Sequence, residues 1–303
     1  MPIVHDFEYF KPAKITEALR LLSKHKGAAV FAGGTDIINE IKEGIAMPDF
    51  LIDIKGLSSL NKIQFKDGKL SIGALVTFSE ILKSSVIKKR LPVFAEVART
   101  VGSVGIRNRA TMVGNICSAV PCMDSGPLLS AFDAMIIVQS LKSKRRIPIF
   151  DWFRGPRKTA LKKGELVTGI EITIPKKKNA GCYAKLGRYT GEDLAQASVL
   201  VLALADHTYR VAFGSVGPVP IRARQIEELL GEEEITDILI AHAQALIPGI
   251  VTPITDIRAS KEYRLQMCQV MFERALRTAV SRLAGVGPEY GINVTEQIGG
   301  VAV

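Results

Sequence analysis

The stretch that decides the fold runs from Val101 to Asp133 and reads VGSVGIRNRATMVGNICSAVPCMDSGPLLSAFD. Three of its glycines, Gly102, Gly105 and Gly114, allow tight backbone curvature and close approach to a ligand. The hydroxyl of Thr111 and the amide of Asn115 can hydrogen-bond phosphate oxygens or pin the loop. The composition therefore predicts a ligand-binding loop.

A second turn of small residues lies upstream, where Ala32 to Asp36 read AGGTD. It follows the apolar run Ala28 to Phe31 and precedes a helical pattern that starts at Ile37. A strand, a glycine turn and a helix start in succession point free N–H groups and a positive dipole end at an anion. Two such loops could hold the two phosphates of one dinucleotide. Neither loop is a G-x-G-x-x-G or G-x-x-x-x-G-K-[ST] signature.

These motifs resemble those of the FAD-binding medium subunits of the molybdenum hydroxylases, which include xanthine, carbon monoxide and nicotinate dehydrogenases. In that family the first loop reads A-G-G-T-D-[IL], as Ala32 to Ile37 do here. The second loop reads I-R-N-x-A-T-x-G-G-N-I, closely matched by Ile106 to Ile116, and an aspartate follows, here Asp124. Three further matches complete the resemblance over residues 1 to about 285, and they lie at Tyr183 to Ala195, Gly214 to Ala223 and Arg258 to Arg264.

The resemblance implies a role for each matched position. The backbone of Val30 to Ile37 would hold the FAD pyrophosphate from one side, and Thr111 to Asn115 from the other. Asp124 would bond the ribityl or ribose region, Val101 would line the pocket, and Lys185 would lie near the isoalloxazine ring. The implied cofactor-binding residues are Val30, Phe31, Ala32, Gly33, Gly34, Thr35, Asp36, Ile37, Val101, Ile106, Thr111, Val113, Gly114, Asn115, Asp124 and Lys185.

The chain departs from the family pattern in three places. Val113 stands where the second loop usually has glycine, and a β-branched residue is disfavoured where φ must be positive. Tyr189 replaces the second arginine of an R-R pair, which either removes a charge or adds an aromatic ring near the flavin face. The strand region Leu166 to Ile174 is about two residues longer than the pattern, so its ring-packing side chain is not assigned.

Hydrophobic periodicity and turn residues predict an α+β chain. The first domain is expected over 1–176, as a two-lobed FAD-binding domain of the PCMH type with lobes of about 1–56 and 57–176 and the cofactor in the cleft between them. The second domain, 177–285, is expected to hold a three-stranded antiparallel sheet and helices, including one that begins near Lys261. Residues 286–303 lose periodicity and are expected to form an extended tail.

Composition excludes several classes of function. The net charge is +10, but the basic residues form short clusters, and the 6% of aromatic residues do not interleave with them, which argues against nucleic-acid binding. The four cysteines lack C-x-x-C spacing, and no nucleophile–base arrangement is visible, so no metal and no catalytic residue is expected. The chain has no run of 18 apolar residues and no signal-peptide pattern, which predicts a cytoplasmic protein without a membrane span.

The resemblance implies electron transfer by bound FAD within a heterotrimeric oxidoreductase, closest to bacterial xanthine or purine dehydrogenases and also similar to carbon monoxide dehydrogenase. A large subunit would hydroxylate a purine, another N-heterocycle or an aldehyde-like substrate at its molybdenum centre. A small [2Fe-2S] subunit would pass electrons to the FAD of this chain and on to an acceptor such as NAD. Two alternatives stay open: a stand-alone FAD reductase of the same fold, and a non-catalytic assembly subunit for which Val113 is the sign.

Overall fold

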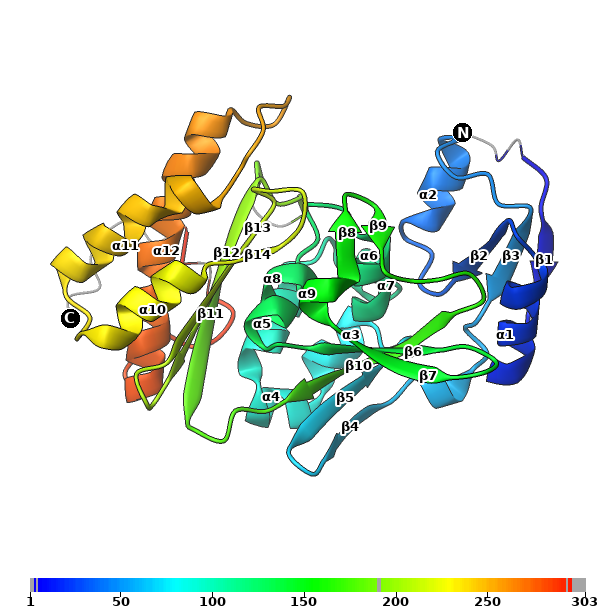
Figure 1. Cartoon of the computed structure of the whole chain (residues 1–303), viewed down its shortest axis with the longest axis horizontal. Coiled ribbons are helices and arrows are strands. Elements are labelled where there is room, and N and C mark those ends of the chain that lie inside the picture. Colours follow the sequence, from blue (N-terminus) through cyan, green and yellow to red (C-terminus); the bar gives the residue numbers. More distant parts are fainter. Residues whose placement is uncertain (1–2, 4, 190–191, 293, 296–303) are drawn as a thin grey trace.

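The computed structural model describes residues 3, 5–189, 192–292 and 294–295. The three larger sheets follow one another along the long axis of the molecule, with the N-terminal sheet at one end and the C-terminal sheet and its helices at the other (Figure 1). Beyond the N-terminal sheet, runs of helices and runs of antiparallel strands follow one another, as the sequence predicts for an α+β chain. None of the helices among the described residues is long and apolar enough to cross a membrane.

The N-terminal sheet is parallel, with the order β1-β3-β2. Its elements are β1 (Glu8–Phe10), α1 (Ile15–Lys24), β2 (Ala28–Phe31), α2 (Ile37–Lys42) and β3 (Phe50–Asp53). Helix α1 buries the apolar face that the sequence shows, through Ala18, Leu19 and Leu22. Strand β2 pairs in parallel with β3. The AGGTD turn follows the carboxyl end of β2 directly, and α2 begins just after that turn.

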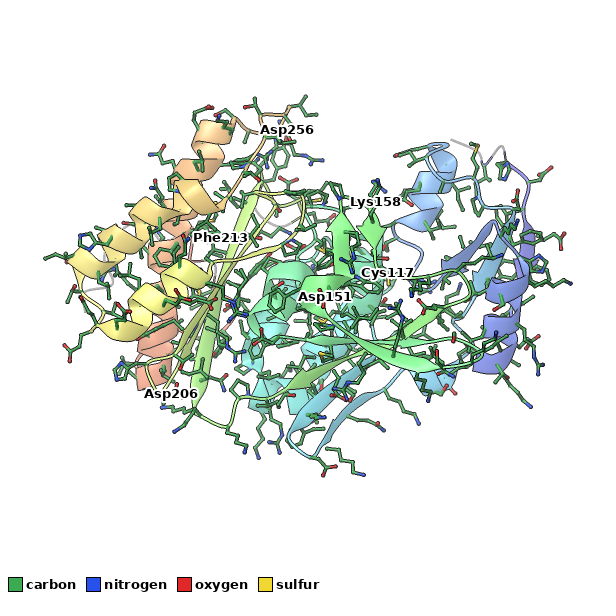
Figure 2. All side chains as sticks on the ribbon, viewed as in Figure 1. Cys117, Asp151, Lys158, Asp206, Phe213 and Asp256 are labelled. Atoms are coloured by element: carbon green, nitrogen blue, oxygen red, sulfur yellow. The ribbon has the colours of Figure 1, made fainter. Side chains whose placement is uncertain are left out.

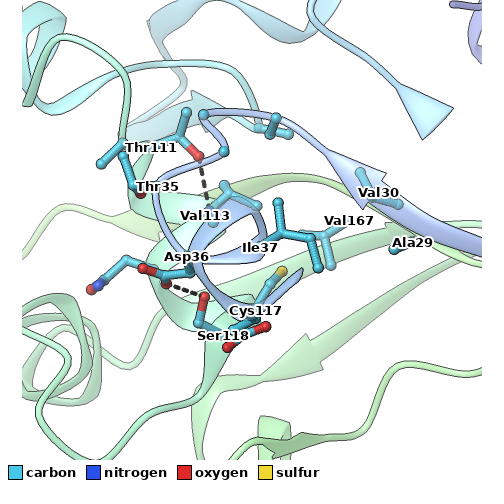
Figure 3. A pocket seen from close by; sticks show the side chains of 18 of the residues that line it. Ala29, Val30, Thr35, Asp36, Ile37, Thr111, Val113, Cys117, Ser118 and Val167 are labelled. Carbon is cyan, nitrogen blue, oxygen red and sulfur yellow. Dashed lines mark hydrogen bonds between the residues drawn. The ribbon is translucent and has the colours of Figure 1, made fainter. Parts of the chain in front are cut away.

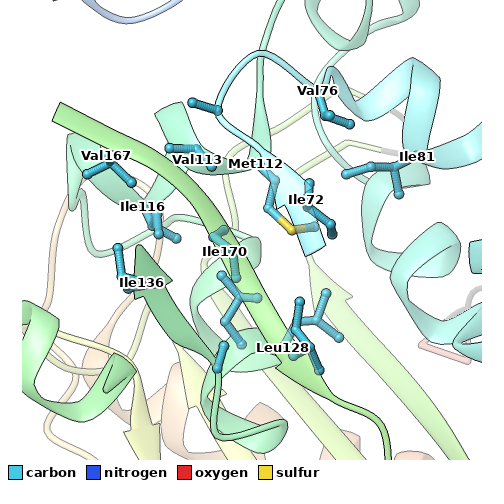
Figure 4. Packing of buried hydrophobic residues seen from close by; sticks show 14 of the residues in the cluster. Ile72, Val76, Ile81, Met112, Val113, Ile116, Leu128, Ile136, Val167 and Ile170 are labelled. Carbon is cyan, nitrogen blue, oxygen red and sulfur yellow. The ribbon is translucent and has the colours of Figure 1, made fainter. Parts of the chain in front are cut away.

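The central sheet is antiparallel, with the order β4-β5-β10-β6-β7. Its strands are β4 (Ile63–Lys66), β5 (Lys69–Gly73), β6 (Met135–Gln139), β7 (Lys144–Pro148) and β10 (Leu166–Thr173). A hairpin turn at Asp67 and Gly68 joins β4 to β5, with φ of 49° and 73°. Apolar side chains of Ile72, Ile136 and Ile170 face the helices and pack with Met112 and Leu128 (Figure 4).

Short elements pack around this sheet or connect its strands. They are η1 (Ser58–Leu60), α3 (Phe78–Lys83), α4 (Ser85–Arg90), α5 (Pro92–Arg99), α6 (Val104–Arg107), α7 (Met112–Ser118), α8 (Ser125–Ala131), α9 (Ile149–Trp152), β8 (Phe153–Gly155) and β9 (Lys158–Thr159).

The stretch from Val101 to Asp133 is therefore largely helical, and the prediction of one long loop was wrong. Local capping explains the difference: Ser103 accepts a hydrogen bond from the N–H of Ile106 at 3.2 Å, and Thr111 accepts one from Gly114 at 2.9 Å. A side-chain oxygen at this position satisfies an orphan N–H of the first turn and starts a helix. The glycines that suggested a loop lie at the helix ends or within these short helices.

The C-terminal sheet has the antiparallel order β11-β12-β13-β14. Its elements and the helices that cover it are β11 (Asn179–Leu186), β12 (Ala197–Leu204), β13 (Tyr209–Gly214), β14 (Ile221–Arg222), α10 (Arg224–Glu232), α11 (Asp237–Ile250) and α12 (Lys261–Ala284). Three of the strands are the predicted ones, and every residue of β12 is buried. The fourth, β14, has two residues and follows Pro220, so it carries no pattern that predicts a strand.

The chain after α12 folds back on its own domain instead of extending away. Gly285 ends the helix with a φ of 90°, and the ring of Tyr290 lies 4.1 Å from the guanidinium of Arg282. Val294 is buried in the C-terminal core. Of the tail predicted over 286–303, residues 293 and 296–303 lie outside the described residues.

Candidate functional site

A cavity of about 850 Å³ lies where the AGGTD turn meets the helices of the IRNRAT segment. Figure 3 shows Thr35, Asp36 and Ile37 facing Thr111 and Val113 across it, with Val167 of β10 on one side. Its walls come from the N-terminal sheet, from the central sheet and from the segment after β11. Its volume falls within the range of small-molecule sites, which is about 300–1,000 Å³.

Most of the residues that the sequence selects line this cavity. They are Val30, Ala32, Gly33, Gly34, Thr35, Asp36, Ile37, Val101, Ile106, Thr111, Val113, Gly114, Asn115 and Asp124. Phe31 and Lys185 do not line it. The ammonium of Lys55 lies over the ring of Phe31, 3.3 Å from the ring centroid. Lys185 forms an ion pair with Asp124, which does line the cavity.

Gly33 and Gly34 are required by two different contacts. A Cβ on Gly33 would lie 2.2 Å from the carbonyl oxygen of Arg109, so the two loops touch at this point. Gly34 has a φ of 83°, and a Cβ there would lie 2.2 Å from the ring of Phe31. Only glycine satisfies both the conformation and the space. The AGGTD turn is thus held against the second loop, which brings together segments that are far apart in the sequence.

The AGGTD turn presents free hydrogen-bond donors. In the part of the chain that the structure describes, the backbone N–H groups of Gly33, Gly34, Thr35 and Asp36 donate no hydrogen bond to another protein group. Successive unpaired N–H groups in a turn form a concave anion-binding site. This observation shows that the residues present suit the phosphates of a dinucleotide.

The polar side chains of the second loop mainly hold the loop itself. Thr111 caps α7, and the side-chain oxygen of Asn115 accepts a hydrogen bond from the N–H of Ser125 at 3.1 Å. The hydroxyl of Ser118 donates to the carboxylate of Asp36, which ties α7 to the first loop (Figure 3). The sequence left two roles open for Thr111 and Asn115: hydrogen bonds to phosphate oxygens, or hydrogen bonds that hold the loop in place. The contacts within the protein correspond to the second role.

Val113 has helical backbone conformation in α7 and is 4% exposed. It is absent from the residues with positive φ among those described, so its β-branched side chain meets no backbone strain. The expected conflict between valine and the conformation at this position does not arise. The side chain packs in the core and also lines the cavity.

Asp124 lies in the cavity wall with its carboxylate held by two groups from β11. The hydroxyl of Tyr183 donates to its Oδ1 at 2.9 Å, and Nζ of Lys185 lies 3.0 Å from the same oxygen. Nζ of Lys185 also donates to the carbonyl of Thr100 at 2.8 Å. Burial raises the pKa of Asp124, and the charge and hydrogen bonds of Lys185 and Tyr183 oppose that rise.

Several lining residues are not among the predicted cofactor-binding residues. Cys117 and Cys122 line the cavity, as do the segments 161–167 and 192–194. Figure 2 places Cys117 in the middle of the molecule, far from Phe213 of the C-terminal sheet. Burial raises the pKa of Cys117 to about 12, and it also raises that of Cys122. For the two cysteines, the only signal in the sequence was their position between the Ile106 to Ile116 match and Asp124.

The two remaining departures from the family pattern now have structural descriptions. Between Val167 and Gly169 the pairing of β10 with β6 shifts register, so Thr168 is an extra residue in the strand. This bulge accounts for part of the extra length, and Leu166 and Val167 line the cavity beside it. Tyr189 is 68% exposed and does not line the cavity. Among the described residues no group of three His, Cys, Asp or Glu side chains is placed to hold a metal.

Comparison with known protein families gives two matches that follow one another along the chain. Residues 5–177 match the family described as FAD binding domain in molybdopterin dehydrogenase, and residues 183–279 match the CO dehydrogenase flavoprotein C-terminal domain. The chain belongs to the family of FAD-binding medium subunits of the molybdenum hydroxylases. It is an oxidoreductase component whose cofactor is FAD.

Individual relatives agree with this assignment. The glyceraldehyde dehydrogenase medium chain of Sulfolobus acidocaldarius is 31% identical over 276 residues, which cover 90% of this chain and 98% of the relative. The xanthine dehydrogenase FAD-binding subunit of Escherichia coli O157:H7 is 28% identical over 284 residues, covering 91% and 97%. A solved structure of carbon monoxide dehydrogenase from Hydrogenophaga pseudoflava superposes with a TM-score of 0.89 at 29% identity, covering 93% of this chain and 99% of that one.

Proposed function

We propose that FAD lies in the cavity between the two loops, with its pyrophosphate against the AGGTD turn and the start of α7. The observation that carries this proposal is the row of unpaired N–H groups from Gly33 to Asp36, in residues that line the same cavity as Thr111 and Val113. The backbone of Val30 to Ile37 would bind one side of the cofactor. Asp124 would accept hydrogen bonds from its ribityl or ribose hydroxyls, because an ionised carboxylate is a strong acceptor.

Lys185 has a different role in this proposal from the one that the resemblance implies. Its ammonium is 9% exposed and is paired with Asp124, so the charge that reaches the cavity is that of the ion pair and not of a free cation. We propose that Lys185 acts on FAD through Asp124. A buried pair of this kind sets the electrostatic potential at the cofactor more weakly than an unpaired lysine would.

The chain itself supplies binding, orientation and electrostatic tuning, which is the usual contribution of a protein to a flavin site. When bound, FAD supplies reversible electron-transfer chemistry. We propose that the chain links the [2Fe-2S] clusters of a small subunit to an acceptor such as NAD, after hydroxylation of a substrate at the molybdenum centre of a large subunit. A purine, another N-heterocycle or an aldehyde-like molecule is the proposed substrate class, and the cytoplasm is the proposed location.

Co-expression of this chain with the proposed large and small subunits tests the proposal. The purified complex is expected to contain FAD, iron and molybdenum, and substrate should bleach the visible absorption of the flavin. NAD should then restore the absorption. A chain that binds FAD alone and reduces a substrate without partners would instead indicate the stand-alone reductase. A complex that assembles and turns over without flavin would indicate an assembly subunit.

A further inference from the structure

Tyr183 and Lys185 lie on one face of β11, because side chains two residues apart in a strand point the same way. That face packs against the first domain: Tyr183 belongs to the core of the central sheet, whereas its neighbours Cys182 and Ala184 belong to the core of the C-terminal domain. The N–H of Tyr183 donates to Oε1 of Glu96 in α5 at 2.8 Å. The tyrosine is therefore fixed at both its backbone and its ring.

The hydroxyl of Tyr183 has one strong acceptor, the carboxylate of Asp124. Burial and the neighbouring Asp124 raise the pKa of Tyr183 well above its ordinary value, so the hydroxyl keeps its proton and donates. Asp124 is 6% exposed and stands at the N-terminal end of α8, but its side chain makes no capping bond to that helix. Its orientation is set by the contacts with β11 and not by its own helix.

We propose that Tyr183 is a positioning residue for the FAD site: its hydroxyl, together with Lys185, fixes the carboxylate of Asp124 in the cavity wall so that the remaining lone pairs point to the cofactor. The inference rests on the proposed placement of FAD. Two donors from one rigid strand determine the orientation of a planar carboxylate, whereas the flexible lysine alone would leave it free to rotate. Tyr183 itself does not line the cavity.

The test is a double-mutant cycle on the full chain, with Tyr183→Phe, Asp124→Asn and the double variant, and with the FAD dissociation constant as the readout. Tyr183→Phe keeps the buried ring and removes one hydrogen bond to a charged group, which should weaken FAD binding about tenfold. In the Asp124→Asn background the same change should have little further effect, because residues that act through each other are not additive. Tyr209→Phe is the control, since it removes the hydroxyl of a tyrosine that is 7% exposed on β13 of the same sheet.

The pH dependence of FAD binding separates positioning from a general loss of structure. Without the Tyr183 hydroxyl the pKa of Asp124 should rise further, so Tyr183→Phe should begin to lose FAD at higher pH than the unaltered chain. The groups that face this carboxylate are Tyr183 and Lys185 from β11 and Cys122 from its own segment. The pKa of Cys122 and of Tyr183 is raised, so both groups keep their protons and stay neutral over this pH range.

Additive effects in the cycle, an unchanged dissociation constant in Tyr183→Phe, or an equal loss in Tyr209→Phe would each overturn the positioning role. FAD binding by the unaltered chain and by Asp124→Asn shows whether only the role of Tyr183 fails or the proposed placement of FAD fails as well. If it binds FAD, and Asp124→Asn weakens that binding while Tyr183→Phe does not, the placement stands and only the role of Tyr183 falls. If Asp124→Asn also has no effect, the placement of FAD against Asp124 fails, and the inference fails with it.

Discussion

Glu96 of α5 and Arg282 of α12 form a buried ion pair 2.8 Å long, with each side chain 3% exposed. Glu96 also accepts hydrogen bonds from the N–H groups of Tyr183 and Gly291. One carboxylate therefore joins the helices of the central sheet to β11, to α12 and to the chain that follows α12. These contacts fix the position of the strand that carries Tyr183 and Lys185 relative to the cavity.

Removal of Glu96 should strongly destabilise the protein. Glu96→Ala leaves a buried guanidinium without its counter-charge, which typically costs about 3–5 kcal/mol. Urea unfolding followed by circular dichroism measures the change. The control is Glu273→Ala, which breaks a half-exposed pair with Arg277 and should cost less than about 1 kcal/mol. Equal costs for the two variants would show that the buried pair has no special role.

Restoring the family glycine at position 113 should not improve FAD binding. Val113 is buried and helical, so Val113→Gly removes core contacts and lowers helix propensity at a cost of about 2 kcal/mol. We expect a lower melting temperature and unchanged FAD affinity. Val104→Gly, at an exposed position of α6, is the matched control for the change in propensity. A marked gain in FAD affinity in Val113→Gly would support the view that valine has weakened the site.

Glu165 should make stability dependent on pH in the acid range. Burial raises its pKa, but hydrogen bonds from Arg145 and from the N–H of Lys162 outweigh that effect, and the net pKa lies below the ordinary 4.5. A lowered carboxylate pKa gives stability that is fully present above the unfolded value and is lost as the pH falls through the folded one. Glu165→Gln should therefore be less stable than the unaltered chain at neutral pH. The difference in melting temperature should shrink as the pH falls below 4.5, and a constant difference would contradict this.

The cysteines of the cavity should react slowly in the native protein. Burial raises the pKa of Cys117 to about 12, and the thiolate is the reactive form. At mildly alkaline pH, a disulfide reagent should modify Cys117 and Cys122 much faster after unfolding than before. Peptide mapping of the labelled sites should also show that FAD slows both reactions, with Cys268 of the other domain as an internal control. No effect of FAD on either cavity cysteine would argue against cofactor binding in this cavity.

Much of the fold follows from local sequence signals. The apolar stripe of α12, the buried strand β12 and the Asp67–Gly68 turn all have the periodicity or turn chemistry that specifies them. The helices within 101–133 were missed because each is short, and α6 and α7 begin at a serine or threonine cap among glycines. Helices of this length have little periodicity of their own, and tertiary packing stabilises them.

The motifs predicted which residues line the site, but not the contacts that these residues make with one another. The residues of both loops gather at one cavity, but the sequence does not reveal that Lys185 is neutralised by Asp124 or that Tyr183 supports the same carboxylate. These contacts join positions about sixty residues apart on separate domains, and one sequence contains no signal for such a pairing. The bulge at Thr168 likewise depends on pairing between strands and not on local pattern.

The central claim is that FAD binds between the AGGTD turn and the second loop, and Gly33→Ala tests it most directly. The new Cβ would meet the carbonyl oxygen of Arg109 at 2.2 Å and separate the loops, whereas Gly105→Ala, beside the same cavity, meets only the Ser103 hydroxyl at 3.6 Å. The measurement is the visible absorption spectrum of each purified, folded protein, with the released flavin quantified after denaturation. We expect one FAD per chain in the unaltered protein and in Gly105→Ala and little in Gly33→Ala; a full complement of FAD in Gly33→Ala would contradict the account.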